Sequence, residues 1–378
     1  MNKRKEKKGY NMIIKKNKED KRNSFISFDD LPNVLIRYLS YFFELDSLIK
    51  FSSTNKRNRV IFFEFRIVYS FLNKNQFFSK KDPILLQKIL KKEYNEIKSE
   101  VSGFSLLHFA CFHSSFEMIK YFLENKMDIN TKDQKNNLPL HISIQNENVS
   151  LEIIKFLVER KSDLNALDIN KNNTLGLACK NESISLEMVK YLVESKCDLN
   201  SNNQTNLSLL HIMCLKKNCS TEILEYLIEC KCDINSKENY RSIPLSFACD
   251  NSNISFEVIK FLVENKSNLN AKDISDTIPI SYACENTNTS FKILKLLVEN
   301  KSDLNLQNEK GYSPFHFVCE NRNLTIEMFN LFVEYKSDLN LLNCDGQSPL
   351  EIASNNREFK KKIQLSFGEN STIKTIFK

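Results

Sequence analysis

A three-residue pattern, usually Asp-Ile-Asn or Asp-Leu-Asn, returns at a fixed interval along most of this chain. Neighbouring copies are always 35 residues apart. One supersecondary unit repeated at a constant interval builds a stack in which each unit contacts only its neighbours, so the period predicts a solenoid. The core of such a stack grows linearly, and 378 residues therefore need not divide into several globular domains. The asparagines of the pattern are Asn130, Asn165, Asn200, Asn235, Asn270, Asn305 and Asn340.

Each interval contains two apolar segments separated by polar turns. In one unit, residues 138–144 form the shorter segment, and residues 151–158 carry apolar side chains at helical spacing. A hydroxyl residue precedes the second segment and a glutamate usually follows two residues later, as expected at the start of a helix. Proline opens the first segment in several units, where a helix tolerates it. We therefore expect turn, helix, turn, helix in every unit and an all-α fold. The hydroxyl residues are Ser115, Ser150, Ser185, Ser220, Ser255, Ser290 and Thr325.

This unit resembles the ankyrin repeat. The family's Thr-Pro-Leu-His opening is similar to Leu138-Pro139-Leu140-His141, and its Ala-Asp-Val-Asn closing is similar to Ser162-Asp163-Leu164-Asn165. The resemblance implies an ankyrin solenoid over residues 82–366, with about seven and a half units of 33–35 residues. We expect a capping helix at 82–92, a last half-unit at Gly346 to Asn355, and a final helix around Glu358 to Leu365.

Two departures from the family pattern bear on the structure. The interval is 35 residues instead of the usual 33, and we place the extra pair between the two helices, for example at Asn148-Val149. The family's glycine after the second helix is replaced by lysine, and a left-handed backbone there costs about 1 kcal/mol for any residue except glycine. Either the stack absorbs this strain or the helix ends differently. The lysines are Lys126, Lys161, Lys196, Lys231, Lys266, Lys301 and Lys336. Asparagines follow the first helix, and we expect them to be left-handed C-caps: Asn146, Asn181, Asn251, Asn286 and Asn321.

The residues that suggest chemistry mostly occupy repeat positions. His108, His141, His211 and His316 share one position, where the ankyrin resemblance implies hydrogen bonds between neighbouring turns. Six cysteines share another position, where a small buried side chain lets helices stack closely: Cys111, Cys179, Cys214, Cys249, Cys284 and Cys319. Cys197, Cys230 and Cys232 lack the spacing of a zinc site. We find no phosphate-binding loop and no nucleophile paired with a base. We therefore expect no catalytic residue, cofactor, metal or small-molecule substrate.

The ankyrin resemblance implies a protein partner on the concave face, which the first helices and turn tips form. The surface predicted for this partner changes from aromatic at the N-terminal end to acidic at the C-terminal end, and the acidic part is suited to a basic segment. The alternative is that these residues are ordinary solvated helix ends. The predicted contact residues are Phe104, Phe112, His113, Gln145, Lys180, Leu215, Tyr240, Asp250, Glu285, Tyr312 and Glu320.

Residues 25–75 form a separate apolar head before the repeats. Their pattern resembles an F-box, the module that docks on a Skp-type adaptor of cullin-RING ubiquitin ligases. Val34, Thr54 and Asn58 depart from that pattern, and a plain helical domain is the alternative. The resemblance places the adaptor contact within residues 28–60, at Leu31, Pro32, Leu35, Leu39, Phe43 and Leu48.

The charge of the chain is concentrated at its start. Residues 1–22 hold ten Lys or Arg and three Asp or Glu, which equals the net charge of +7, so the remainder is balanced. We expect residues 1–24 to be a disordered basic tail that serves as an import signal, a tether or a solubilising segment, and residues 367–378 to be a C-terminal tail. No secretion signal or spanning segment is expected, so the eleven cysteines indicate cytosol or nucleus.

Two functions follow from this organisation. The chain is either the substrate-recognition subunit of a Skp–cullin–F-box ligase, with the repeats holding the substrate, or a plain ankyrin scaffold without a role in ubiquitin transfer. Both are non-catalytic protein-binding functions, and we expect a monomer. Nucleic-acid binding through the basic tail is a weaker third interpretation. Whether residues 25–75 bind a Skp-type adaptor distinguishes the ligase subunit from the plain scaffold.

Overall fold

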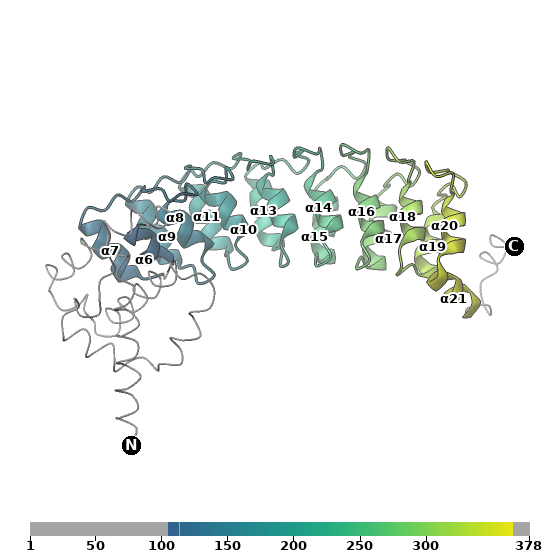
Figure 1. Cartoon of the computed structure of the whole chain (residues 1–378), viewed down its shortest axis with the longest axis horizontal. Coiled ribbons are helices and arrows are strands. Elements are labelled where there is room, and N and C mark those ends of the chain that lie inside the picture. The colour runs from purple at the N-terminus through teal and green to yellow at the C-terminus, as the bar shows by residue number, and fades with distance from the viewer. Residues whose placement is uncertain (1–104, 113, 366–378) are drawn as a thin grey trace, which may run out of the picture. The chain divides into compact units, whose positions relative to one another are not determined.

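The computed structural model describes residues 105–112 and 114–365, which belong to one compact unit, Ser102–Lys378. The described residues form eight helix pairs, labelled as in Figure 1. The first helices are α6 (Leu106–Phe112), α8 (Pro139–Gln145), α10 (Thr174–Lys180), α12 (Leu209–Leu215), α14 (Pro244–Asp250), α16 (Pro279–Glu285), α18 (Pro314–Glu320) and α20 (Pro349–Asn355). The second helices are α7 (Phe116–Glu124), α9 (Leu151–Glu159), α11 (Leu186–Glu194), α13 (Thr221–Glu229), α15 (Phe256–Glu264), α17 (Phe291–Glu299), α19 (Ile326–Glu334) and α21 (Arg357–Leu365). The predicted head at 25–75, the cap at 82–92 and both tails lie outside the described residues.

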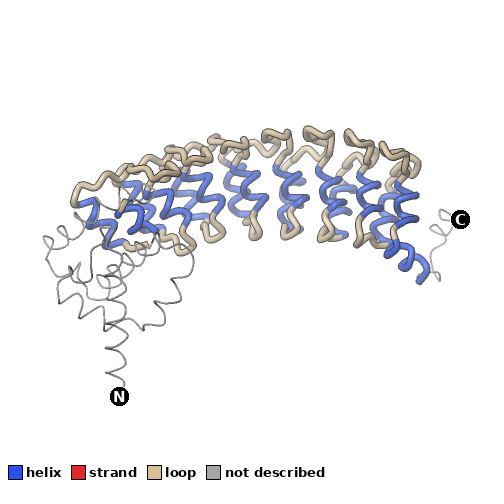
Figure 2. The backbone as a smooth tube through the Cα atoms, in the orientation of Figure 1, coloured by secondary structure: helices blue, strands red, loops and turns tan. Residues whose placement is uncertain are grey.

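The pairs stack side by side, with loops along both edges of the stack (Figure 2). Successive first helices contact one another more closely than successive second helices do, so the stack curves toward the first helices. This arrangement confirms the predicted order of turn, helix, turn, helix in the part of the chain that the structure describes, and it places the concave surface on the first helices.

The helix starts follow from local sequence. The side-chain oxygens of Ser185, Ser220, Ser255, Ser290 and Thr325 accept a hydrogen bond from the backbone N–H three residues later, as N-caps do. Ser115 and Ser150 occupy the same position with extended backbone but make no such bond. Proline opens α8, α14, α16, α18 and α20, where the first turn has no use for its missing N–H.

The lysine that follows each of the first seven second helices, α7 to α19, has a left-handed backbone. Its φ is 62° at Lys126 and 69° at Lys161, and the other five copies lie between 60° and 71°. The stack therefore absorbs the strain at every copy instead of ending the helix in another way. Each helix ends in the same manner, with the N–H of this lysine donating to a carbonyl in the last turn, for example to Val158 at 2.9 Å.

The recurring Asp-x-Asn pattern joins neighbouring repeats. Within one copy, the Asp163 carboxylate accepts the Asn165 N–H at 2.9 Å and closes a turn. The Asn165 side chain then accepts the Asp198 N–H of the next copy at 2.8 Å. Corresponding cross-repeat bonds are made by Asn130, Asn235, Asn270 and Asn305. The asparagine is therefore a repeated tie between the ends of the second helices.

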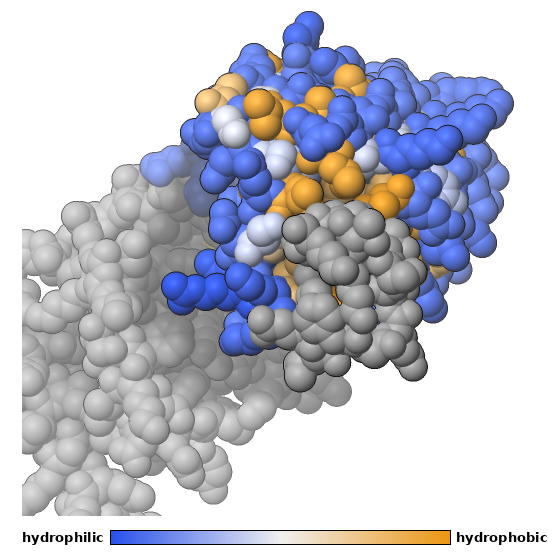
Figure 3. Space-filling model, turned by 90° about the vertical axis from the view of Figure 1, so that its right-hand side faces the viewer, coloured by the Kyte–Doolittle hydropathy of each residue, from blue (hydrophilic) through white to orange (hydrophobic). Residues whose placement is uncertain are grey.

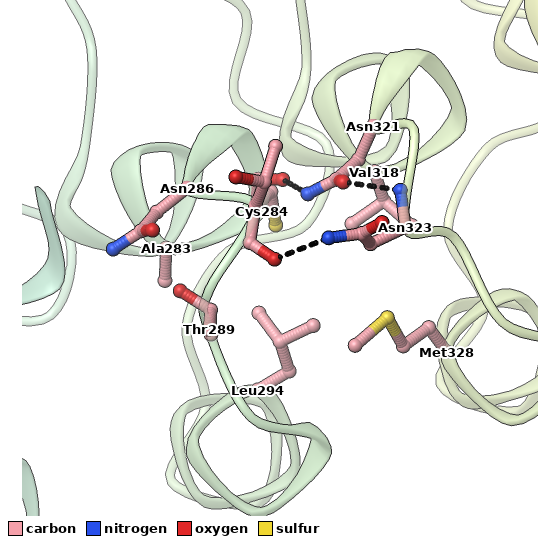
Figure 4. A pocket seen from close by; sticks show the side chains of 10 residues that line it. Ala283, Cys284, Asn286, Thr289, Leu294, Val318, Asn321, Asn323 and Met328 are labelled. Carbon is pink, nitrogen blue, oxygen red and sulfur yellow. Dashed lines mark hydrogen bonds between the residues drawn. The ribbon is translucent and has the colours of Figure 1, made fainter. Parts of the chain in front are cut away.

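The asparagines after the first helices tie repeats together at another point, and their predicted backbone was wrong. They do cap the helices, but Asn181 has φ −74° and ψ 121°, which is extended, and the other copies agree. With the backbone extended, the asparagine side chain points toward the preceding repeat. Asn181 donates to the carbonyls of Ile144 and Asn146 at 2.7 and 2.9 Å, and Asn321 donates to the Cys284 carbonyl at 2.7 Å (Figure 4). The two inserted residues form the turn that makes this reach possible.

The core runs through the stack as rows of equivalent side chains. Leu107, Leu140, Leu175, Leu210, Leu245, Ile280 and Phe315 occupy one position and are fully buried. The last member, Leu350 in the last described pair, is only half-buried. Figure 3 views this end of the array, where apolar side chains lie among charged ones, and Leu342 there is 58% exposed.

The last described unit is a helix pair, in which α20 lies within the expected half-unit at Gly346 to Asn355. The predicted final helix is present as α21, and Asn356 alone separates it from α20. Phe359 of α21 is fully buried and stacks 5.3 Å from Phe329 of α19. The other side of α21 is rich in lysine, which suits a helix that closes the end of a solenoid.

Candidate protein-binding surface

Three of the four repeat histidines make the expected ties between turns. In the pairs Ser105–His108, Ser208–His211 and Ser313–His316, the serine hydroxyl lies 2.8 Å from the ring Nδ1. The ring Nε2 then lies 2.9, 3.0 and 3.2 Å from the carbonyls of Asn137, Ser242 and Gln347 in the next repeat. These imidazoles are fully buried, and both ring nitrogens are hydrogen-bonded, so their role is to join neighbouring repeats.

His141 is the exception to this prediction. Its ring is fully buried, but neither ring nitrogen has a hydrogen-bond partner. Leu138 takes the place of the capping serine, so no hydroxyl orients the ring. Burial lowers the pKa of His141 to about 4, although the carboxylates of Asp168, Asp133 and Asp163 oppose that shift. The ring is therefore neutral, and both of its nitrogens lack a hydrogen-bond partner.

Burial suppresses the reactivity of the shared cysteine position, and the surface hollow near Asn321 is small. Burial raises the pKa of the Cys111 and Cys179 thiols to about 12, so both stay protonated and unreactive. Among the residues that the structure describes, no three His, Cys, Asp or Glu side chains are grouped so that they could hold a metal ion. A shallow hollow beside Asn321, lined by Leu294 and Met328, has room for about one water molecule (Figure 4).

Seven of the predicted contact residues occupy one structural position, the last residue of a first helix. All of those described are exposed, at Phe112, Gln145, Lys180, Leu215, Asp250, Glu285 and Glu320. They form a row along the concave side, one per repeat. Phe104 and His113 lie outside the described residues, as do the adaptor positions Leu31, Pro32, Leu35, Leu39, Phe43 and Leu48.

The two predicted tip residues behave differently. Tyr240 is 65% exposed at the tip of its turn, where its carbonyl accepts the Ile274 N–H of the next repeat at 2.8 Å. Tyr312 is half-buried, and its ring lies 5.3 Å from that of Phe317 on the adjoining helix. Tyr240 is therefore available to a partner, whereas Tyr312 forms part of the wall of the concave surface.

The carboxylates of Asp250, Glu285 and Glu320 form an acidic row over three successive repeats. Partial burial, together with the charges of Asp250 and Glu320, raises the pKa of the central Glu285. None of the three takes part in an ion pair within the described part of the chain. The row therefore carries like-charge repulsion that a cationic ligand would relieve.

The structure adds an aromatic row that the sequence analysis did not single out. Phe247, Tyr282 and Phe317 are half-buried and stand three residues before the carboxylates on the same helices, so each ring neighbours one acidic side chain. The Tyr282 hydroxyl donates to the Asp273 carboxylate, and burial followed by that bond raises the pKa of Tyr282. In the sequence, each aromatic residue of this row stands one residue after the histidine position of its repeat, and this register could have identified the row.

The N-terminal half of the row is not acidic. Phe112 and Leu215 each expose 51% of their surface, and the Lys180 ammonium donates to the Asn172 side chain at 2.8 Å. Burial lowers the pKa of Lys180, against the attraction of Asp168. The exposed ends of the first helices thus change from apolar and weakly basic to acidic along the stack, whereas the sequence analysis expected an aromatic N-terminal end. That a partner contacts this row stays a prediction.

Comparison with protein families supports the architecture just described. A family model for ankyrin repeats, in three copies, matches residues 77–174, 175–273 and 280–364. The chain belongs to the ankyrin-repeat family. Ankyrin repeats indicate protein–protein interaction, which agrees with the exposed row on the concave side of this array. No curated protein was found to match the ankyrin chain. None of the helices described in it has the length and apolar character needed to cross a membrane.

Proposed function

We propose that this ankyrin protein is a non-catalytic recognition module that holds a partner protein on its concave face. The observation that supports this most directly is the row of exposed side chains that end the first helices, because its members share one structural position but differ in chemistry. The buried histidines and cysteines, by contrast, pack inside the array and are not accessible to a partner. Chemical variation along an exposed row is what a partner-specific surface requires.

We further propose that the acidic row receives a basic segment of the partner. First helices that pack at about 10 Å place the carboxylates of Asp250, Glu285 and Glu320 at about that interval. A segment extended in the polyproline II conformation advances about 3.1 Å per residue with three residues per turn, so every third side chain lies on one face and meets one carboxylate. The rings of Phe247, Tyr282 and Phe317 give the cationic groups an aromatic surface beside each carboxylate.

Calorimetry with defined peptides tests this ligand chemistry. The probe is an extended peptide of repeated Lys-Ser-Thr triplets, and the control probe has Glu in place of Lys. The lysine peptide should bind the full chain, and the triple variant Asp250→Lys, Glu285→Lys and Glu320→Lys should weaken binding by at least about tenfold, because each exposed pair contributes up to about 1 kcal/mol.

A matched variant separates the row from net charge. Glu225→Lys, Glu229→Lys and Glu334→Lys make the same change in charge on the second helices. This control should bind the lysine peptide as the unaltered chain does. Equal weakening in both triple variants would show that the acidic row is not the contact surface.

The finer form of the proposed function is that of a ligase substrate receptor, in which residues 25–75 dock on a Skp-type adaptor while the array holds the substrate. Its support is the residue pattern that begins at Leu31-Pro32 and continues through Leu35, Leu39 and Phe43. A purified Skp-type adaptor should bind the full chain, and Leu31→Asp with Leu39→Asp should abolish that binding. An adaptor that does not bind the unaltered chain leaves the function of a plain ankyrin scaffold.

A further inference from the structure

The ties between repeats are not equal along the array. One cross-repeat tie comes from the asparagine that follows a first helix, a second from the asparagine of the Asp-x-Asn pattern, and a third from the buried histidine. Every joint among the described repeats has the first of these ties, except the joint between α10–α11 and α12–α13.

All three ties are altered at that single joint. Gly176 stands at the histidine position and has no side chain to donate. The Asn200 side chain makes no bond to the next copy of the pattern, whereas Asn165 and Asn235 on either side do so at 2.8 and 2.7 Å. Lys216 replaces the asparagine that follows the first helix.

Lys216 restores only part of what an asparagine supplies. Lys216 as a residue is 6% exposed, and its ammonium donates to the Asn181 carbonyl at 2.7 Å. The asparagines at the flanking joints each donate to two carbonyls; Asn251, for example, reaches Cys214 and Lys216 at 2.9 and 2.8 Å. Within the described residues, no side chain donates to the corresponding Cys179 carbonyl.

The turn after α12 is also less constrained than its equivalents. After Asn181, the side-chain oxygen accepts the Ser183 N–H at 2.8 Å and closes the turn, and Asn251 does the same at 3.0 Å. A lysine has no acceptor with which to close the turn in this way. The ammonium must in addition be kept out of water, and its burial lowers the pKa of Lys216 even with Glu182 nearby.

The direct contacts that remain across the joint are few in type. The Gln204 N–H donates to the Asn170 carbonyl at 2.8 Å, and the Lys217 N–H donates to the Glu182 carboxylate at 3.4 Å. The Lys190 ammonium lies 5.4 Å from the centre of the Tyr226 ring. The apolar row through Leu175 and Leu210 continues across it. Burial of apolar surface therefore stabilises this joint, and fewer side-chain hydrogen bonds cross it than cross the two joints beside it.

We propose that the array opens as two blocks, α6–α11 and α12–α21, at this joint, where one buried lysine replaces the asparagine and histidine ties. The blocks divide the exposed row, with Phe112, Gln145 and Lys180 on the first, and Leu215 and the acidic row on the second. Opening therefore changes the spacing between the apolar and acidic halves of the concave surface. In a stack with nearest-neighbour coupling, the weakest interface sets where such opening occurs.

Hydrogen exchange of the full chain, followed by mass spectrometry, tests this division. Amides of α8–α11 should share one protection factor, amides of α14–α19 a higher one, and the change should occur as a step at the joint. Lys216→Asn supplies the missing bonds and should raise protection of α8–α11 about tenfold, because each net hydrogen bond is worth about a factor of two to ten. Protection of α16–α19 should stay unchanged.

A reciprocal variant is the matched control. Asn251→Lys creates the same replacement one repeat later. Because Lys216 is still present, and the His211 and Asn235 ties remain at the new joint, this variant should lower the protection of α12–α13 and add a second, smaller step at the joint between α12–α13 and α14–α15. A smooth gradient of protection from the centre to the ends, with no step, would overturn the proposal. So would a step that stays in place, with the same height, in Lys216→Asn.

Discussion

Replacing two histidines of the same repeat position by leucine should have opposite effects on stability. His211 holds the Ser208 hydroxyl and reaches the Ser242 carbonyl, whereas the equally buried His141 has no partner for either ring nitrogen. Leucine is similar in size to the ring and needs no hydrogen bond. His211→Leu should therefore destabilise its joint, and His141→Leu should stabilise its joint.

The magnitudes follow from the bonds involved. His211→Leu removes two hydrogen bonds of about 1 kcal/mol each, so the loss is about 2 kcal/mol. A neutral imidazole buries one donor and one acceptor, and each unsatisfied group costs about 1–3 kcal/mol. Poorer shape complementarity of leucine offsets part of this, which leaves a gain of about 1 kcal/mol for His141→Leu.

Hydrogen exchange at pH 8, where both rings are neutral, measures each effect at its own joint. At about 1.4 kcal/mol per factor of ten, amides of α12–α15 should lose about 30-fold protection in His211→Leu, and amides of α8–α11 should gain about fivefold in His141→Leu. His316→Leu should behave like His211→Leu, because its ring makes the same two contacts. Loss of protection of similar size in His141→Leu would refute the reasoning that its nitrogens are unsatisfied.

Three further predictions concern recurring features, and the first two are measured by the urea midpoint. Lys161→Gly should raise the free energy of unfolding by about 1 kcal/mol by relieving the left-handed backbone, whereas Lys155→Gly inside α9 should lower it by about as much; a loss in both would contradict this. Ser267→Ala removes a buried hydroxyl that has no partner and should add about 1 kcal/mol, against a loss of about 1 kcal/mol for the capping Ser255→Ala. Burial lowers the folded pKa of the four repeat histidines, to about 4 at His141, so the folded state binds fewer protons. Stability should therefore be complete above about pH 6.5 and fall toward pH 4, as circular dichroism would follow, and less steeply in His141→Leu.

The repeating parts of the fold could be predicted because they depend on local chemistry. The hydroxyl caps, the prolines and the 3.6-residue stripes specify each helix within a few residues of sequence. The extra pair of residues was placed correctly between the helices. The row of exposed ends, from Phe112 to Glu320, followed from the register of the repeat alone.

The errors arose where a side chain acts between repeats. Asn181 was expected to be left-handed because asparagine tolerates that conformation, but its bonds to Ile144 and Asn146 in the preceding repeat require extended backbone. His141 has the same sequence position as His211, and only the neighbouring Leu138 explains why its ring is unsatisfied. The sequence analysis missed the aromatic row beside the acidic one. Its residues stand three positions before the carboxylates, and only a helix brings residues at that separation onto the same face.

By itself, the sequence determined the repeat, its period, its helices and the chemistry displayed on the concave face, because each of these is encoded within one unit. Only the tertiary structure showed what the Asp-x-Asn pattern does, since its asparagine bonds to the next copy, 33 residues further along the chain. The same holds for the joint at Lys216. Its weakness is a property of two neighbouring units in contact, and a bond between units depends on geometry that no single unit contains.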